Sequence, residues 1–324
     1  MASLLKDILS VQERFNNDKV HVFVEKYWHW SIYISCVYVV TVFALKAWME
    51  NRRKYDLRTP LLLWSSLLAL FSIYGFWMNG IDHMKHLWQN GWEKSICEST
   101  MIDGAKGLWS FLFCFSKAPE LMDTYFIVLR KQKLIFLHWY HHITVFVYCW
   151  FHYSRQIHAA QWFIVMNYFV HAVMYSYYAV RASGRYRPPV WVNMFITLLQ
   201  LMQMFVGVAI NLFVYYQMTT DPNWNCDGKI ETTYLYVYWS FLMYFSYLLL
   251  FAHFFYGAYI SRKSRSKGTK QSADAIKSGV NGSQNGHFQH AKGVTTVDKI
   301  NGHLSNGNSI DNEPELRRRM LRQH

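Results

Sequence analysis

The sequence predicts an all-α membrane protein with seven transmembrane helices. Of 324 residues, 52% are hydrophobic and 19% aromatic, whereas only 16% are charged. Aromatic enrichment with sparse charge is typical of membrane proteins. Apolar runs also recur along the chain, each near the ~20 residues that a bilayer core requires. The formal charge of +13 lies in short clusters beside these runs. This favours membrane topology and anionic lipid headgroups over nucleic acid as the partner.

The elements are expected in a simple order. Residues 1–28 are polar and mixed in charge, which predicts an amphipathic N-terminal segment at the membrane surface. A seven-helix domain follows over residues 29–262, with a long loop at 80–107. Its spans are expected at 29–49, 60–79, 108–129, 134–153, 161–181, 190–216 and 232–260. The tail, residues 263–324, is rich in Gly, Ser, Asn and His and cannot bury a core, so we expect disorder there.

The distribution of Lys and Arg predicts the orientation. Basic clusters occupy every second connection and the start of the tail, whereas the other connections carry few basic residues. By the positive-inside rule the tail is cytosolic and the N-terminus lumenal or extracellular. Cys97 and Cys226 then both lie on the non-cytosolic side, where disulfides persist, and could pair.

The sequence His138-Trp-Tyr-His141-His142 lies inside the fourth expected span. Positions i, i+3 and i+4 share one helix face, so the three histidines form one imidazole patch. An ionisable side chain within a span costs roughly 2–3 kcal/mol and commonly marks a site. A single histidine in a helical bundle is often only bonded to a neighbour, but three on one face favour function.

Polar stripes occur in the neighbouring spans as well. In the third span Pro119 should kink the helix. Charges within a membrane persist when they face the bundle interior and pair, so the stripes predict one polar chamber. For the Gln and Thr stripe of the sixth span, hydrogen bonding between helices is the simpler interpretation. The stripes consist of Lys117, Glu120 and Thr124, with Asp123 to one side; of Asn167, His171, Met174, Tyr175 and Tyr178; and of Thr197, Gln200 and Gln203.

The histidine patch should lie near the cytosolic boundary. His138 is about 7–8 Å beyond Lys133 along a helix. A polar substrate head could therefore enter from the cytosol, with an apolar tail running deeper. Arg130 and Lys133 would suit an anionic, phosphate-bearing head group, although positive-inside topology explains them equally well.

Taken together, these motifs resemble the fatty acid elongases, the 3-ketoacyl-CoA synthases of the endoplasmic reticulum that extend acyl chains by two carbons. The resemblance covers about residues 30–262. It rests on Lys117-x-x-Glu-x-x-Asp-Thr, His138-x-x-His-His, Asn167-x-x-x-His-x-x-Met-Tyr-x-Tyr-Tyr and Thr197-x-x-Gln-x-x-Gln. The stretch 131–145 is similar to the subgroup that prefers saturated and monounsaturated chains of up to about C16, an inference by analogy.

The resemblance implies a barrel of six of the seven helices around a narrow acyl-chain tunnel. It implies condensation of acyl-CoA with malonyl-CoA to 3-ketoacyl-CoA, CO2 and CoA, without a metal or other cofactor. Membrane lipids, the other enzymes of the elongation cycle and a second copy of the chain are the expected partners, and no nucleic acid. The protein would be a multi-pass protein of the endoplasmic reticulum membrane, although the dilysine pattern usual at the C-terminus is not visible.

The resemblance also implies residue roles. His141 is the expected nucleophile, since acyl transfer to an imidazole nitrogen splits one hard step into two. His138 and His142 would orient it or move protons, and His171 would polarise the thioester or the malonyl group. Lys117 and Asn167 would hold a substrate carbonyl or carboxylate, with Glu120 and Asp123 fixing Lys117. The remaining expected substrate-binding residues are Tyr175, Tyr178, Gln200, Gln203, Arg130 and Lys133.

Two other classes of protein remain open at this point. Membrane di-iron desaturases and hydroxylases also use His-x-x-His-His, but they need several such boxes to ligate two metals. Here there is one box, and the pair His83-x-x-His86 lies in the loop expected on the opposite side. A seven-helix receptor or transporter could line a ligand site with the same polar stripes.

Overall fold

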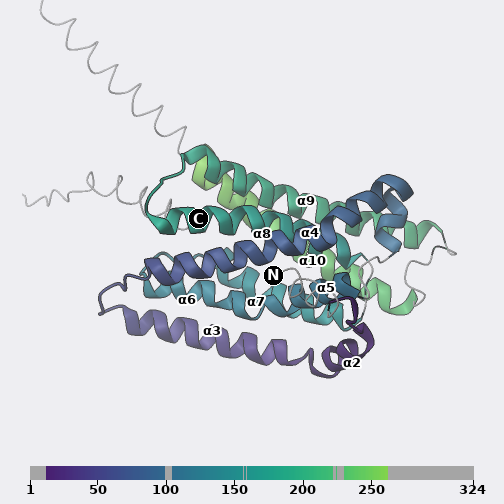
Figure 1. Cartoon of the computed structure of the whole chain (residues 1–324), viewed down its shortest axis with the longest axis horizontal. Coiled ribbons are helices and arrows are strands. Elements are labelled where there is room, and N and C mark those ends of the chain that lie inside the picture. Colours follow the sequence, from purple (N-terminus) through teal and green to yellow (C-terminus); the bar gives the residue numbers. More distant parts are fainter. Residues whose placement is uncertain are drawn as a thin grey trace, which may run out of the picture. The chain divides into compact units, whose positions relative to one another are not determined.

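The computed structural model describes residues 12–98, 104–155, 157, 159–221, 224 and 230–261, and every regular element in these ranges is helical (Figure 1). The elements are α2 (Asn17–Tyr27), α3 (Trp30–Met49), α4 (Arg58–Cys97), α5 (Gly104–Ser116), the 3₁₀ turn η1 (Pro119–Leu121), α6 (Met122–Leu129), α7 (Phe136–Tyr153), α8 (Ala160–Ser183), α9 (Val190–Thr220), α10 (Ile230–Phe255) and the π-helical turn η2 (Tyr256–Ile260).

The chain divides into two units. Residues 1–253 form the first and contain all of the helices up to nearly the end of α10. The second covers residues 254–322, of which the described part is the end of α10, η2 and Ser261. The expected tail, residues 263–324, and the first eleven residues lie outside the described ranges.

Within the described residues, five helical segments are long and apolar enough to cross a membrane. They are Trp30–Met49, Arg58–Cys97, Ala160–Ser183, Val190–Thr220 and Tyr234–Ile260. These match the first, second, fifth, sixth and seventh expected spans, so a multi-pass helical protein is confirmed. The third and fourth expected spans are helical but fall short of this length or hydropathy. The third is interrupted. The fourth is α7, which has 18 residues, and the three polar histidines of the patch are among them.

The second expected span ends far later than the sequence suggested. The expected loop at 80–107 is helical as far as Cys97, with one kink at Gly91, whose φ of 82° is readily adopted by glycine. Packing against α8 explains the extension. The His83 ring lies edge-on to Trp162 at 4.7 Å, and Trp92 lies 5.0 Å from the same indole. The pair His83-x-x-His86 is therefore part of a helix, not of a loop.

The third expected span is broken where Pro119 predicted a kink. Helix α5 ends at Ser116, the turn η1 begins at Pro119, and α6 continues from Met122. Proline lacks a backbone N–H and clashes with the preceding turn, which interrupts an α-helix. The break lies directly beside Lys117 and Glu120, so it determines how these two charged side chains are presented.

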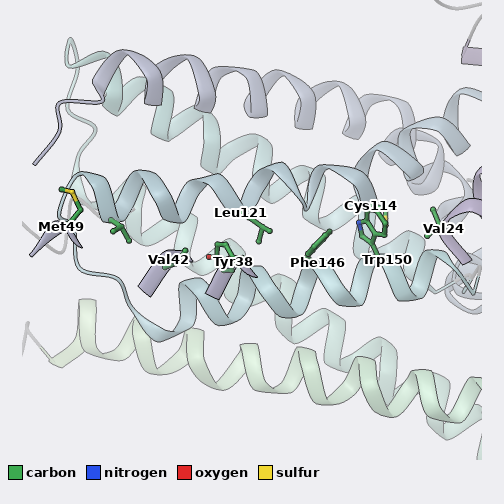
Figure 2. Packing of buried hydrophobic residues seen from close by; sticks show 9 residues of the cluster. Val24, Tyr38, Val42, Met49, Cys114, Leu121, Phe146 and Trp150 are labelled. Atoms are coloured by element: carbon green, nitrogen blue, oxygen red, sulfur yellow. The ribbon is translucent and has the colours of Figure 1, made fainter. Parts of the chain in front are cut away.

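Two packing regions hold the first unit together. Helix α3 packs against α6 and α7, which lie beside it in Figure 1, and α2 packs against α5 and α7. Figure 2 shows the apolar cluster along this side. Its buried members are Val24, Tyr38, Val42, Met49, Cys114, Leu121, Val128, Phe146 and Trp150. In the second region α4 packs closely along α8, which also contacts α9.

The close approach of α4 to α8 depends on glycine at position 75. A Cβ atom there would lie 2.3 Å from ring atoms of Tyr168. The Tyr168 ring is buried, and its hydroxyl donates to the carbonyl oxygen of Trp109 at 2.8 Å. The ring is thus held at both ends and has little room to move.

We therefore expect Gly75→Ala to destabilise the protein by about 1–3 kcal/mol, the usual cost of overpacking. Thermal unfolding in detergent should show a midpoint lowered by several degrees. Gly257→Ala is the matched control, because no atom lies within 4 Å of its added Cβ. A Gly75→Ala midpoint equal to that of the control would contradict the close packing.

Candidate active site

The histidine patch lies near the beginning of α7. Ile135, which precedes the helix, is extended, and helical geometry then continues from Phe136 to Tyr153. The ring centroids of His138 and His142 are 4.5 Å apart, and those of His141 and His142 are 5.6 Å apart. The three imidazoles therefore form one contiguous group, as their spacing predicts.

Lys117 lies at the centre of the second polar group. Its Nζ donates to Glu120 Oε1 at 2.8 Å, to Glu120 Oε2 at 3.0 Å and to Asn167 Oδ1 at 3.0 Å. An ammonium has three donors, so these contacts can use all of them. The Ser116 hydroxyl also donates to Glu120 Oε1 at 2.9 Å. The side chains of Lys117 and Glu120 are only 2% and 4% exposed. This is a fully buried, hydrogen-bonded ion pair.

The two groups meet in the interior of the first unit. His171 on α8 is buried, and its Nδ1 lies 3.8 Å from Glu120 Oε2. His141 lies within range of electrostatic interaction with both His171 and Lys117. The turn η1 also packs against α7, which carries the histidine patch. Residues from α7, α8 and the α5–η1 break thus contribute to one buried polar site.

Asp123 has partners that the sequence did not suggest. It was expected to fix Lys117, but its Oδ1 accepts from Trp64 Nε1 and its Oδ2 accepts from the Tyr175 hydroxyl, both at 2.6 Å. Charge-assisted hydrogen bonds of this length are among the stronger ones in proteins. Asp123 therefore joins α6 to α4 and α8, whereas the Glu120 carboxylate accepts from Lys117.

The remaining predicted residues take varied positions. Gln200 donates to the sulfur of Met174 at 3.3 Å, which is a contact between α9 and α8, and Gln203 is buried. The Tyr178 ring lies 6.1 Å from that of Tyr175. Arg130 ends α6, and Lys133 is exposed in the connection to α7.

Only one of the two cysteines of the predicted disulfide lies within the described residues. Cys97, at the end of α4, is disulfide-bonded. Cys226 lies outside the described residues, so its pairing with Cys97 stays a prediction. The thiols of Cys36, Cys114 and Cys149 are free.

Several residues near the site were not predicted. Trp64 of α4 binds Asp123, and Tyr247 of α10 packs on His141. Tryptophan and tyrosine are common throughout this sequence, so their residue type alone carries no signal. Over the described residues, no group of three or more His, Cys, Asp or Glu side chains is arranged to hold a metal ion.

Fold and site together define a class: a multi-pass helical membrane enzyme with a buried histidine and lysine site. Comparison with known proteins gives the family. Residues 23–267 match the model of the ELO: GNS1/SUR4 family. Very long chain fatty acid elongase 6 of Rattus norvegicus is 44% identical over 261 residues, 79% of this chain and 96% of the relative. The Homo sapiens protein of that name is 43% identical with the same coverage, and the Drosophila melanogaster one is 45% identical over 253 residues, 76% of this chain and 78% of the relative.

The chain therefore belongs to the ELO family of fatty acid elongases. It is accordingly a 3-ketoacyl-CoA synthase, which performs the condensing step of very-long-chain fatty acid elongation on acyl-CoA and malonyl-CoA. The resemblance noted from the four sequence motifs is confirmed. The desaturase and receptor interpretations are not supported.

The buried pair leads to a stability prediction. Lys117→Met leaves the Glu120 carboxylate buried without its cation, and breaking a buried pair in this way costs about 3–5 kcal/mol. We expect Lys117→Met to lose condensation activity as well. The double variant Lys117→Met/Glu120→Gln should recover much of the thermal stability that Lys117→Met loses, but none of its activity. Thermal unfolding in detergent measures the stability, and condensation assays in detergent measure the activity.

The control for this prediction is the exposed pair Lys106–Asp82, whose atoms are 2.8 Å apart and whose side chains are 37% and 41% exposed. Lys106→Met should cost no more than about 1 kcal/mol, as is usual for surface pairs. Equal stability of Lys117→Met and Lys106→Met would show that the buried pair has no special role.

Proposed function

We propose that this elongase condenses saturated and monounsaturated acyl-CoAs of up to about C16 with malonyl-CoA, using His141 as the nucleophile in a two-step reaction. One observation carries the proposal: imidazoles from α7 and α8 lie around the buried Lys117–Glu120 pair. The chain-length range rests on the resemblance of residues 131–145 to the subgroup that prefers such chains.

In the first step a ring nitrogen of His141 attacks the thioester carbonyl carbon. The carbon–sulfur bond breaks, and CoA leaves as a thiolate. The acylated imidazole gives up its ring proton to His138 or His142, whose rings belong to the same patch, and that proton neutralises the thiolate. The product is an acyl-imidazole on His141. Each of the neighbouring imidazoles returns to its neutral form.

In the second step malonyl-CoA loses CO2, and the resulting enolate carbon attacks the acyl carbon. The carbon–nitrogen bond to His141 breaks, which releases 3-ketoacyl-CoA, and the departing imidazolate takes up one proton from solvent through His138 or His142, which restores the neutral imidazole. The transient oxyanions need hydrogen-bond donors fixed in advance. Lys117 can only donate, so it binds Oδ1 of Asn167, and the Nδ2 donor of Asn167 is not used in that contact. We assign Asn167 Nδ2 and His171 to this task, with Lys117 orienting Asn167.

Helix contacts support a barrel formed by the second to seventh expected spans. Helix α4 packs on α8, α8 on α9, and α5 on both α4 and α7. Helix α10 is joined to α7 by hydroxyl pairs, and its Tyr244 ring packs on Gly207 of α9. From this order of contacts we infer a ring in which the acyl tunnel would lie, with α3 outside it, against α6 and α7.

The dimensions of α7 support the proposed chain length. An extended chain advances about 1.2 Å per bond, since three backbone bonds span about 3.5 Å, so a C16 acyl chain reaches about 18 Å. The helix rises by the same amount, about 18 Å, between His141 and Tyr153. Phe151, about 15 Å beyond His141 along the helix, contacts Trp28 and Tyr236, with ring separations of 4.9 and 5.3 Å. We assign the closed end of the tunnel to these aromatic rings.

The orientation proposed from the basic clusters agrees with this arrangement. The connection between α6 and α7 carries Arg130 and Lys133, beside the end of α7 where the histidines lie. Lys131 donates to the carbonyl oxygens of Glu50 and Arg52, which ties this connection to the end of α3. A cytosolic entrance here, a lumenal N-terminus and residence in the endoplasmic reticulum membrane complete the proposal, together with docking of other elongation-cycle enzymes.

The two-step route is tested by incubating the purified protein with palmitoyl-CoA alone and following its intact mass. We expect a covalent acyl adduct that is absent in His141→Ala and is discharged as C18 3-ketoacyl-CoA when malonyl-CoA is added. His152→Ala is the control, since this α7 histidine is bonded to the Tyr148 carbonyl away from the patch. Full condensation activity in His141→Ala would refute His141 as the nucleophile.

The tunnel-end assignment predicts longer products from Tyr236→Ala, because removing the ring opens space beyond the tail of a C16 chain. The variant should elongate C18 and C20 acyl-CoAs, measured by mass spectrometry of the 3-ketoacyl products. Tyr244→Ala is the comparison. Its ring packs at 4.5 Å on Phe163 and 6.3 Å from Tyr148, about 10 Å below His141 along α7. Longer products from Tyr244→Ala alone would place the tunnel end there instead.

A further inference from the structure

The contact between α7 and α10 includes three hydroxyl pairs. Tyr140 pairs with Ser246 at 3.1 Å, Thr144 with Tyr247, and Tyr148 with Ser240 at 2.8 Å. The three α7 residues follow i, i+4, i+8 spacing and so form one stripe along the helix. The stripe starts beside His141, so α10 contacts the helix face next to the proposed nucleophile.

The middle pair differs from the other two because it also touches the nucleophile. The Tyr247 ring centroid lies 5.0 Å from that of His141, with 50° between the ring planes. Its hydroxyl lies 3.4 Å from the His141 carbonyl oxygen, and the side chain is 1% exposed. The His141 ring also lies edge-on to His142. The imidazole therefore contacts both a histidine of its own helix and a tyrosine of α10.

The hydroxyl protons can be assigned from their partners. Thr144 Oγ1 donates to the Tyr140 carbonyl oxygen at 2.6 Å, and a hydroxyl has one proton. The Tyr247 hydroxyl then donates to Thr144 Oγ1 or to the His141 carbonyl oxygen, both of which are groups of the protein. Since this donor is used within the protein, Tyr247 is not poised to give a proton to substrate. The contact fixes the position of the ring.

We propose that Tyr247 is a positioning residue for the condensation reaction, holding the His141 imidazole in the rotamer that attacks the thioester. This inference rests on the proposed role of His141. A misplacement of about 1 Å at a reacting group can cost about 100-fold in rate. Without the Tyr247 ring, the His141 side chain gains rotational freedom toward α10, and fewer encounters with the thioester are productive.

Three variants separate positioning from general stability. Tyr247→Leu removes the ring that packs on His141. Tyr247→Phe keeps the ring and loses the bond to Thr144. Ser240→Ala is the matched control, because it removes the Tyr148–Ser240 bond of the same interface, away from His141. Thermal unfolding of each variant in detergent reports the loss of stability, and palmitoyl-CoA is the probe for the single-turnover acylation rate and the KM.

We expect Tyr247→Leu to lower the acylation rate by about 10- to 100-fold, with KM changed by about twofold or less. Tyr247→Phe should restore most of that rate, and Ser240→Ala should acylate like the wild type despite a comparable loss of stability. The proposal is overturned if Tyr247→Leu acylates at the wild-type rate, or if Ser240→Ala slows acylation equally.

The same assay distinguishes failure of this proposal from failure of the underlying mechanism. If the wild type forms product without any adduct, or if His141→Ala keeps its activity, the two-step mechanism fails. The role of Tyr247 is then judged by the ratio of steady-state kcat values for Tyr247→Leu and Ser240→Ala. Equal kcat values reject it, and a selective loss in Tyr247→Leu supports a positioning role for the group that the ring contacts.

Discussion

The buried ion pair of Lys117 and Glu120 is the interaction on which the site depends. Taking two charges out of water is costly and is offset only when both are paired and hydrogen-bonded. Here Ser116 supplies one partner from the same chain segment, whereas Asn167 supplies another from α8. The pair is thus satisfied only when the α5–η1 break and α8 are correctly docked. The same docking brings His171 to Glu120, so the condition for a stable interior is also the condition for assembling the site.

The helices that surround this pair pack in two different ways. Helix α4 meets α8 closely, with a glycine facing the Tyr168 ring. Helix α10 instead meets α7 through side chains, and the paired hydroxyl groups span the gap between the two backbones. The close packing of α4 on α8 leaves no room for a further side chain between the two helices. The tyrosine side chains between α7 and α10, in contrast, leave room for an imidazole beside them. His141 of the histidine patch lies at this second interface, where the Tyr247 ring contacts it.

The sequence predicted correctly those side-chain contacts that lie within one helical segment. The patch of His138, His141 and His142 follows from i, i+3, i+4 spacing, and the pairing of Lys117 with Glu120 follows from i, i+3. It failed where the answer depends on which helices are neighbours. The extension of α4 to Cys97 needs Trp162 of α8, and the partners of Asp123 come from α4 and α8. Periodicity reports which face of a helix is buried and does not report what lies against it.

In the proposed mechanism, the position of the histidines within α7 links the chemistry to the size of the substrate. The patch lies at the start of an 18-residue helix, and apolar and aromatic residues occupy most of the remaining turns. Because a helix rises by a fixed amount per residue, about 1.5 Å, the distance from the nucleophile to the aromatic rings at the far end is set by sequence position alone. A helix therefore fixes the length available to an acyl chain more reproducibly than a loop could. Under the proposed mechanism, selectivity for chain length would need no moving part: it would follow from placing His141 and Phe151 on one continuous helix, with Trp28 and Tyr236 beside Phe151 at the far end.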